Sequence, residues 1–122
     1  MNSLELDQLL QRVDRLGLEC DGLSRVLSVL LRHAGCTHRV LVGSLCVDGH
    51  GEIPLHCWIE LEDGQVCDLR ARMWLGADPR VPHGRFTPTS DQQYVAHVEL
   101  AALPADSILF EILAGAPVAS FF

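Results

Sequence analysis

The sequence predicts an α+β domain in which two N-terminal helices pack on a small antiparallel β-sheet. Two apolar stripes with a helical period occupy the first third of the chain, and segments rich in β-forming residues follow them. An Asp63-Gly64 pair between two of these segments is a strong signal for a β-hairpin. With 122 residues, the chain has the length of a single domain covering residues 1–122.

The first predicted helix covers about residues 4–16, where apolar side chains recur every three or four positions: Leu6, Leu9, Leu10, Val13 and Leu16. A longer stripe runs from Leu23 to Ala34 and predicts a second helix over about residues 20–34. Gly17 and Gly35 follow the two stripes, in the position where a glycine commonly ends a helix.

Four strands are predicted after the helices, over about residues 39–47, 55–61, 65–69 and 94–100. Residues 70–93 are rich in Gly, Pro and Arg and are predicted to form one long loop. A loop of that length in a compact domain is more often functional than not. The apolar segment from Ser107 to Leu113 fits either a short helix or a buried strand, because its period does not separate the two.

The composition excludes several functional classes. Hydrophobic residues make up 48% of the chain and charged residues 20%, which is typical of a folded globule. The chain contains nine arginines, no lysine and sixteen acidic residues. Its net charge of −7 disfavours nucleic acid or an anionic membrane as a partner. Neither a membrane span nor a signal peptide is recognisable, so we expect a cytoplasmic protein. The five cysteines lack C-x-x-C spacing and are expected to be mostly reduced thiols.

Cys20 falls in the first turn of the second predicted helix, on its apolar stripe, so its sulfur is expected to point toward the sheet. Free N–H groups and a partial positive charge at a helix N-terminus favour a thiolate over a thiol. This position is therefore suited to a nucleophile. It suits equally a free cysteine that only fills the core.

A candidate base for this thiol lies on the strand over residues 55–61. Alternation places His56, Trp58 and Glu60 on one face of this strand, and its apolar residues on the other face as core: Leu55, Cys57, Ile59 and Leu61. An imidazole next to a thiol acts as its base, and a third group fixes the tautomer of the imidazole. Asp68, on the next predicted strand, is the candidate for this third group.

The register of the hairpin decides whether Asp68 shares a face with His56. A two-residue turn at Asp63-Gly64 sets Asp68 opposite Ile59, on the wrong face. A three-residue loop from Glu62 to Gly64, with the glycine in the left-handed conformation, sets it opposite Trp58 and diagonal to His56. Apolar pairing mildly favours the first register and a triad requires the second. We predict the second, bulged form.

The candidate catalytic residues occur in the order Cys, His, Asp, each within a short motif. Cys20 begins the run Cys-Asp-Gly-Leu-Ser-Arg, which is followed along the chain by Val-Leu-Val-Gly, His56-Cys-Trp58, Asp63-Gly64 and Asp68. Over about residues 17–70 this resembles the transglutaminase-like superfamily of papain-fold cysteine enzymes. The resemblance implies a papain-like core and a peptidase, amidase or acyl transferase working through a thioester. It implies Cys20 as the nucleophile, His56 as general base and then acid, and Asp68 as the orienting group, with no cofactor and no metal.

Four further residues are candidates for substrate binding: Trp58, Arg70, Arg72 and Trp74. Trp58 is the aromatic residue that follows the histidine, and the other three lie in the predicted loop. Because guanidinium groups bind carboxylates in a bidentate manner, this loop is suited to an acidic substrate. A solvated loop that neutralises an acidic body explains the arginines equally well. The expected substrate is a peptide, a protein or a small amide.

Two alternatives from other classes remain open. The first is a catalytically inactive binding module of the same fold, which docks a partner through the arginine-rich loop and the exposed Phe121-Phe122 terminus. The second is a zinc protein, with ligands such as Cys36, His38, His56 and Cys67, although their spacing matches no recognised zinc motif.

Overall fold

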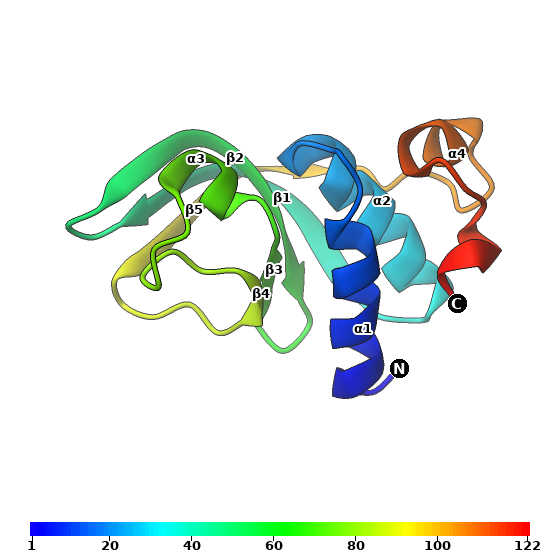
Figure 1. Cartoon of the computed structure of the whole chain (residues 1–122), viewed down its shortest axis with the longest axis horizontal. Coiled ribbons are helices and arrows are strands. Elements are labelled where there is room, and N and C mark those ends of the chain that lie inside the picture. The colour runs from blue at the N-terminus through cyan, green and yellow to red at the C-terminus, as the bar shows by residue number, and fades with distance from the viewer.

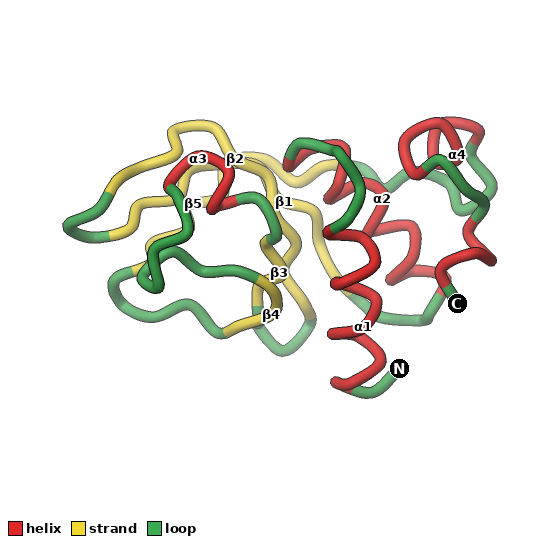
Figure 2. Tube along the Cα trace, in the orientation of Figure 1, coloured by secondary structure: helices red, strands yellow, loops and turns green.

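The chain begins with two helices and two long strands and continues through shorter elements (Figures 1 and 2). The computed structural model describes residues 1–122. It contains the helices α1 Ser3–Asp14, α2 Cys20–His33, α3 Ala71–Leu75, α4 Ile108–Ala114 and the final 3-10 helix η1 Val118–Phe121. The strands are β1 His38–Val47, β2 Gly51–Leu61, β3 Val66–Asp68, β4 Gly84–Phe86 and β5 Gln92–Leu100. The α+β class, both N-terminal helices and the four predicted strands are therefore present, with ends shifted by up to four residues.

Helix α2 is the centre of the helical layer. It packs on β1 and β2 with one side and contacts α1 and α4 with others (Figure 1). Its Val26, Val29 and Leu30 have no solvent exposure. Burial of this apolar surface is the main force that holds α2, and with it Cys20, against the sheet. None of the helices has the length and apolar character needed to cross a membrane.

The five strands form one antiparallel sheet in the order β4-β3-β2-β1-β5. Alternate residues of β2 face opposite layers: Cys57 and Ile59 pack against the helices, whereas Trp58 packs with Leu41 and Val66 on the other side. The Trp58 face was expected to be polar, but it forms a second, smaller core, because Phe86 of β4 and Tyr94 of β5 pack against it. Leu55 was expected in the core and is 74% exposed, since α2 begins at Cys20 and covers no more of β2.

The β2–β3 hairpin has the bulged register that the sequence analysis predicted. Glu60 pairs with Val66 and Ile59 with Cys67, so Asp68 lies opposite Trp58. The three loop residues end in Gly64, whose φ of 87° lies in the left-handed region. The prediction of a three-residue loop is confirmed, and Asp68 lies on the face that carries His56.

Both neighbours of β1 are irregular beside Gly43. In β2, Pro54 and Leu55 together lie opposite Ser44, which makes a bulge immediately before His56. Proline has no N–H to donate to a ladder and is therefore tolerated at a bulge. In β5, His97 is the extra residue between the partners of Val42 and Gly43. Bulges increase the local bend of a sheet, and both of these bulges lie next to the Gly43–His56 pair.

Residues 70–93 do not form a single loop, and this prediction was wrong. The segment contains α3 and β4, each too short to show a period in the sequence. Helix α3 begins where the Asp68 carboxylate accepts the N–H groups of Arg70 and Ala71. Of the two possibilities for the segment from Ser107 to Leu113, the helix is observed: Ser107 caps α4, and Gly115 ends it with a φ of 72°.

Candidate active site

A buried pair of an imidazole and a carboxylate lies at the end of the β2–β3 hairpin. His56 Nε2 is 2.7 Å from Asp68 Oδ2, and the exposed fractions of the two side chains are 0% and 1%. Because Asp68 engages Nε2, Nδ1 is the ring nitrogen left free for another partner. The structure thus brings together two of the three residues that the sequence analysis singled out for acid–base chemistry.

Four donors contact the carboxyl group of Asp68. Besides His56, the Tyr94 hydroxyl donates to Oδ2 at 2.7 Å, and the N–H groups of Arg70 and Ala71 donate to Oδ1 at 3.0 and 3.1 Å. Hydrogen bonds to the charged form of a carboxyl stabilise that form. Burial, together with the Asp68 charge, raises the pKa of Tyr94, so its hydroxyl stays a donor throughout the physiological range.

Cys20 is the first residue of α2 and lines the same pocket as His56. The pocket measures about 310 Å³ and opens between the start of α2, β2 and α3. The N-cap residue, Glu19, makes no capping hydrogen bond through its side chain, so the side chain leaves the first-turn N–H groups of α2 uncapped. The Cys20 thiol and the His56 imidazole therefore line one pocket at the N-terminus of α2.

The ionisation of His56 results from opposing effects. Burial disfavours the charged ring, but the hydrogen bond that the ring donates to Asp68 and the nearby Cys20 thiol outweigh it and raise the pKa of His56 to about 9. Nδ1 makes no hydrogen bond and is the only buried side-chain nitrogen or oxygen in the chain without a partner. The neighbouring group that the His56 ring can reach is the sulfur of Cys20.

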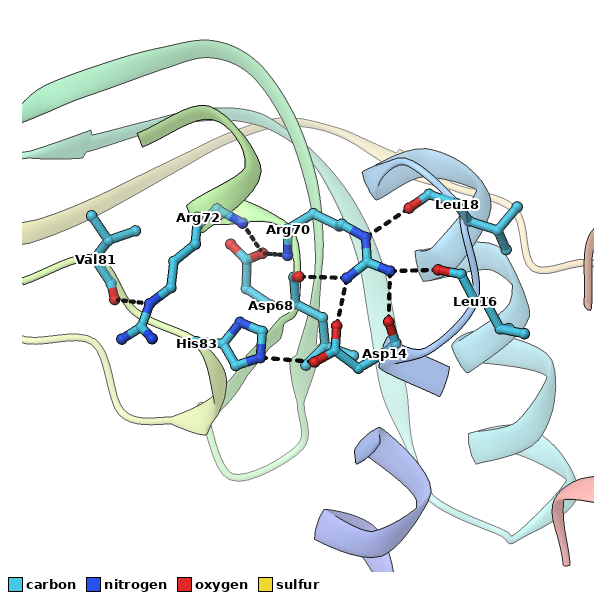
Figure 3. A network of polar contacts seen from close by, with 10 residues as sticks. Asp14, Leu16, Leu18, Asp68, Arg70, Arg72, Val81 and His83 are labelled. Carbon is cyan, nitrogen blue, oxygen red and sulfur yellow. Dashed lines mark hydrogen bonds and ion pairs between the residues drawn. The ribbon is translucent and has the colours of Figure 1, made fainter. Parts of the chain in front are cut away.

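Arg70 ties the strand of Asp68 to the segment that leads into Cys20 (Figure 3). Its guanidinium donates to the carbonyl oxygens of Leu16 and Leu18 at 2.8 and 2.6 Å and to Asp14 Oδ1 at 2.6 Å. His83 Nε2 lies 3.0 Å from the other carboxylate oxygen of Asp14. The start of α2 is thus fixed relative to Asp68 by one side chain, whose donors are occupied and whose exposed fraction is 12%.

The predicted substrate-binding residues are only partly at the pocket. Trp74 lines it and is 61% exposed. Trp58 is buried and packs between His56 and Tyr94, with ring centroids at 6.2 and 4.9 Å, so it shields the pair from solvent and does not reach a ligand. Arg70 is engaged as described, and Arg72 donates to the Val81 carbonyl at 3.0 Å. Trp58, Arg70 and Arg72 were expected to bind substrate, but the structure does not place them in the lining of this pocket.

The other features singled out in the sequence have structural roles. Cys57 and Cys67 are buried core thiols, and burial raises their pKa values to about 11 and about 12. The proposed zinc ligands do not come together, since no three His, Cys, Asp or Glu side chains are placed to hold a metal. Phe121 is 7% exposed and packs edge-on against Phe110, so half of the expected docking terminus belongs to the core.

Sequence reasoning gave no site role to two residues, Tyr94 and Gly43, although Gly43 ends the Val-Leu-Val-Gly motif. Tyr94 lies 26 positions after Asp68, and only the pairing of β5 with β1 brings it to the carboxylate. Gly43 lies opposite His56 and admits the β5 backbone. A single tyrosine in the chain and a glycine in a Val-rich strand were the only signals that could have indicated them.

Comparisons with family models, with curated proteins and with solved structures found no match to this chain. The class of the protein is therefore defined by its own architecture, an α+β fold of four α-helices and a five-stranded antiparallel sheet. Its candidate site is defined by the buried His56–Asp68 pair beside Cys20. Any function has to be inferred from this geometry and from the motifs of the sequence.

Proposed function

We propose that the chain is a papain-like thiol enzyme that takes an acyl group from an amide or ester through a thioester on Cys20. One observation carries the proposal: a cysteine at a helix N-terminus shares a pocket with a histidine whose far nitrogen is bound, at 2.7 Å, to a buried carboxylate. The order Cys-His-Asp and the resemblance to the transglutaminase-like superfamily support the same chemistry.

In the first half of the reaction the Cys20 thiolate attacks the substrate carbonyl carbon, and a C–S bond forms. The negative charge moves to the carbonyl oxygen, within reach of the uncapped N–H groups in the first turn of α2. His56, with a pKa of about 9, is protonated near neutral pH and donates its proton to the leaving amine or alkoxide. The bond to the leaving group breaks, and the thioester remains.

In the second half of the reaction His56 is neutral and acts as a base. It takes a proton from water or from an acceptor amine, whose oxygen or nitrogen attacks the thioester carbon. The C–S bond breaks and returns the sulfur to Cys20, with release of the acid or the new amide. Asp68 holds Nε2 throughout, so that Nδ1 remains the nitrogen that exchanges protons.

The proposal is tested by the reactivity of the thiol. We expect iodoacetamide to label Cys20 at least about tenfold faster than Cys46 at pH 6. A thiolate paired with an imidazolium reacts at pH values at which an ordinary cysteine is still a protonated thiol. Peptide mass spectrometry gives the rate for each cysteine of the same chain, so the partly buried Cys36 and Cys46 are internal controls. His56→Ala should abolish the difference.

If Cys20 in wild type follows the pH profile of Cys46 from pH 5 to 9, and His56→Ala leaves its rate unchanged, the activated pair is rejected. Circular dichroism and urea unfolding of the variant establish that it is folded under the labelling conditions. A folded His56→Ala protein that retains the fast labelling would also count against the proposal.

A further inference from the structure

The pocket beside Cys20 is lined by two acids. Glu19 and Asp21 flank the cysteine in sequence, both line the pocket, and both are exposed. The lining also includes Leu55 and Trp74, and Trp74 is 61% exposed. Of the eight residues that line the pocket, none is an arginine. The cavity thus combines negative charge with an accessible aromatic ring.

The arginines of the segment after β3 are engaged elsewhere. Arg70 binds Asp14, Arg72 donates to the Val81 carbonyl, Arg80 pairs with Asp78 and Arg85 with Asp7. Arg25, one turn further along α2, is not among the residues that line the pocket. The guanidinium groups that made an acidic substrate plausible from the sequence are therefore unavailable to neutralise Glu19 and Asp21.

A separate observation points to a ligand at this place. His56 is 1% exposed and lines the pocket, and its Nδ1 has no hydrogen-bond partner. A buried polar atom left without a partner costs free energy unless the neighbouring Cys20 thiolate or a group that enters the site uses it. The acids and the indole therefore surround a position where a reacting group is expected, and they are not an isolated cluster on the surface.

We infer that the acyl compound accepted beside Cys20 carries a positive charge, as an ammonium or guanidinium group on the part that lies between Glu19, Asp21 and Trp74. Carboxylates pair with such a group, and an exposed indole attracts it through its π face. The inference deepens the proposed thiol chemistry and rests on it. The inferred charge of the substrate is opposite to that of the acidic substrate suggested by the arginines in the sequence.

Two thiol reagents of opposite charge test the inference. Each is a methanethiosulfonate: the sulfur of Cys20 forms a disulfide with the reagent's outer sulfur, and methanesulfinate leaves. One reagent carries a trimethylammonium group and the other a sulfonate. We expect the ratio of the two rates, cation over anion, to be about tenfold higher at Cys20 than at Cys46 in low salt, and to fall as salt is added.

Glu19→Gln with Asp21→Asn should bring the ratio at Cys20 toward that at Cys46. A matched control is Glu62→Gln with Asp63→Asn, which changes the net charge equally but lies beside the other end of α2, with Gly35 and Cys36. Fourteen helical residues place that end roughly 20 Å from Cys20. The control variant should keep the wild-type ratio. Equal ratios in all three proteins would overturn the inference.

A second measurement uses two amides of one shape. Benzoyl-arginine amide carries a guanidinium, and benzoyl-citrulline amide has the same skeleton without charge. We expect the first to slow iodoacetamide labelling of Cys20 at about tenfold lower concentration, because only it pairs with the two carboxylates. If both protect equally while His56→Ala still abolishes fast labelling, the thiol chemistry stands and the charge preference is overturned.

Discussion

Gly43 lies directly opposite His56 in the β1–β2 ladder, and the backbone of β5 fills the space beside it. A Cβ at this position would lie 1.8 Å from the Val95 carbonyl oxygen and 2.9 Å from the Ala96 Cα, which no backbone can accommodate without moving. Tyr94, which donates to Asp68, directly precedes Val95. The spacing of three strands at the site therefore depends on the missing side chain of Gly43.

Gly43→Ala is expected to be among the most damaging single substitutions in the chain, costing about 3 kcal/mol or more in the free energy of unfolding, as overpacking against backbone does. Urea unfolding followed by circular dichroism measures it. Gly17→Ala is the matched control, because nothing lies within 4 Å of a Cβ added there. Equal stability of the two variants would show that β5 does not hold its place against β1.

Asp68→Asn should lower the pKa of His56 well below about 9, because burial then disfavours the charged ring and only the Cys20 thiol still favours it. A titration of the His56 ring followed by NMR gives this pKa directly. Labelling of Cys20 at pH 6 should slow in parallel. A ring that still titrates near 9 in this variant would contradict the role given to Asp68.

Tyr94→Phe removes one of the four donors to Asp68 and should cost about 1 to 2 kcal/mol in the free energy of unfolding, since the lost hydrogen bond is made to a charged acceptor. A double-mutant cycle with Asp68→Asn isolates the interaction. We expect a coupling of similar size. Additive effects of the two substitutions would mean that the 2.7 Å contact does not contribute to stability.

Stability should decrease with rising pH through the titration of His56. A pKa raised from 6.5 to about 9 stabilises the folded state fully below pH 6.5, and this contribution is lost as the pH rises through 9. The difference in unfolding free energy between wild type and His56→Gln should therefore shrink by roughly 3 kcal/mol from pH 6 to pH 10. A difference that stays constant or grows over that range would contradict the raised pKa.

Arg70→Lys should destabilise the protein by about 2 to 4 kcal/mol although the charge is kept, because an ammonium cannot donate to Leu16, Leu18 and Asp14 together. Arg72→Lys is the control, since Arg72 makes one hydrogen bond, to Val81, and should cost less than about 1 kcal/mol. Thermal unfolding of both variants measures the two losses of stability. Equal losses would show that Arg70 does not act as a tie.

The elements that could be predicted from the sequence are those fixed by local pattern. The stripe from Leu23 to Ala34 is long enough to define α2, and therefore the place of Cys20 in its first turn. The Asp63-Gly64 pair predicted the hairpin, and the need to place Asp68 with His56 selected the observed register. Short elements such as α3 and β4 lack a period and escaped notice.

What the sequence could not predict depends on contacts between distant segments. Trp58 was assigned to substrate binding as the aromatic residue that follows the histidine, but Tyr94 of β5 packs against its ring and it is buried. Arg70 was assigned to a substrate because its nearest acidic partner, Asp14, lies 56 positions away in sequence. In each case the pairing of charges or rings is set by the tertiary fold, and a single sequence contains no measure of it.

The tie made by Arg70 also has a consequence for the order of events during synthesis. Cys20 is synthesised fifty residues before Arg70, whose side chain binds the segment leading into α2. It is synthesised seventy-four residues before Tyr94, which donates a hydrogen bond to Asp68. Until then the nascent polypeptide exposes an ordinary sulfhydryl. The proposed activation of Cys20 therefore depends on contacts that form only when the chain has folded.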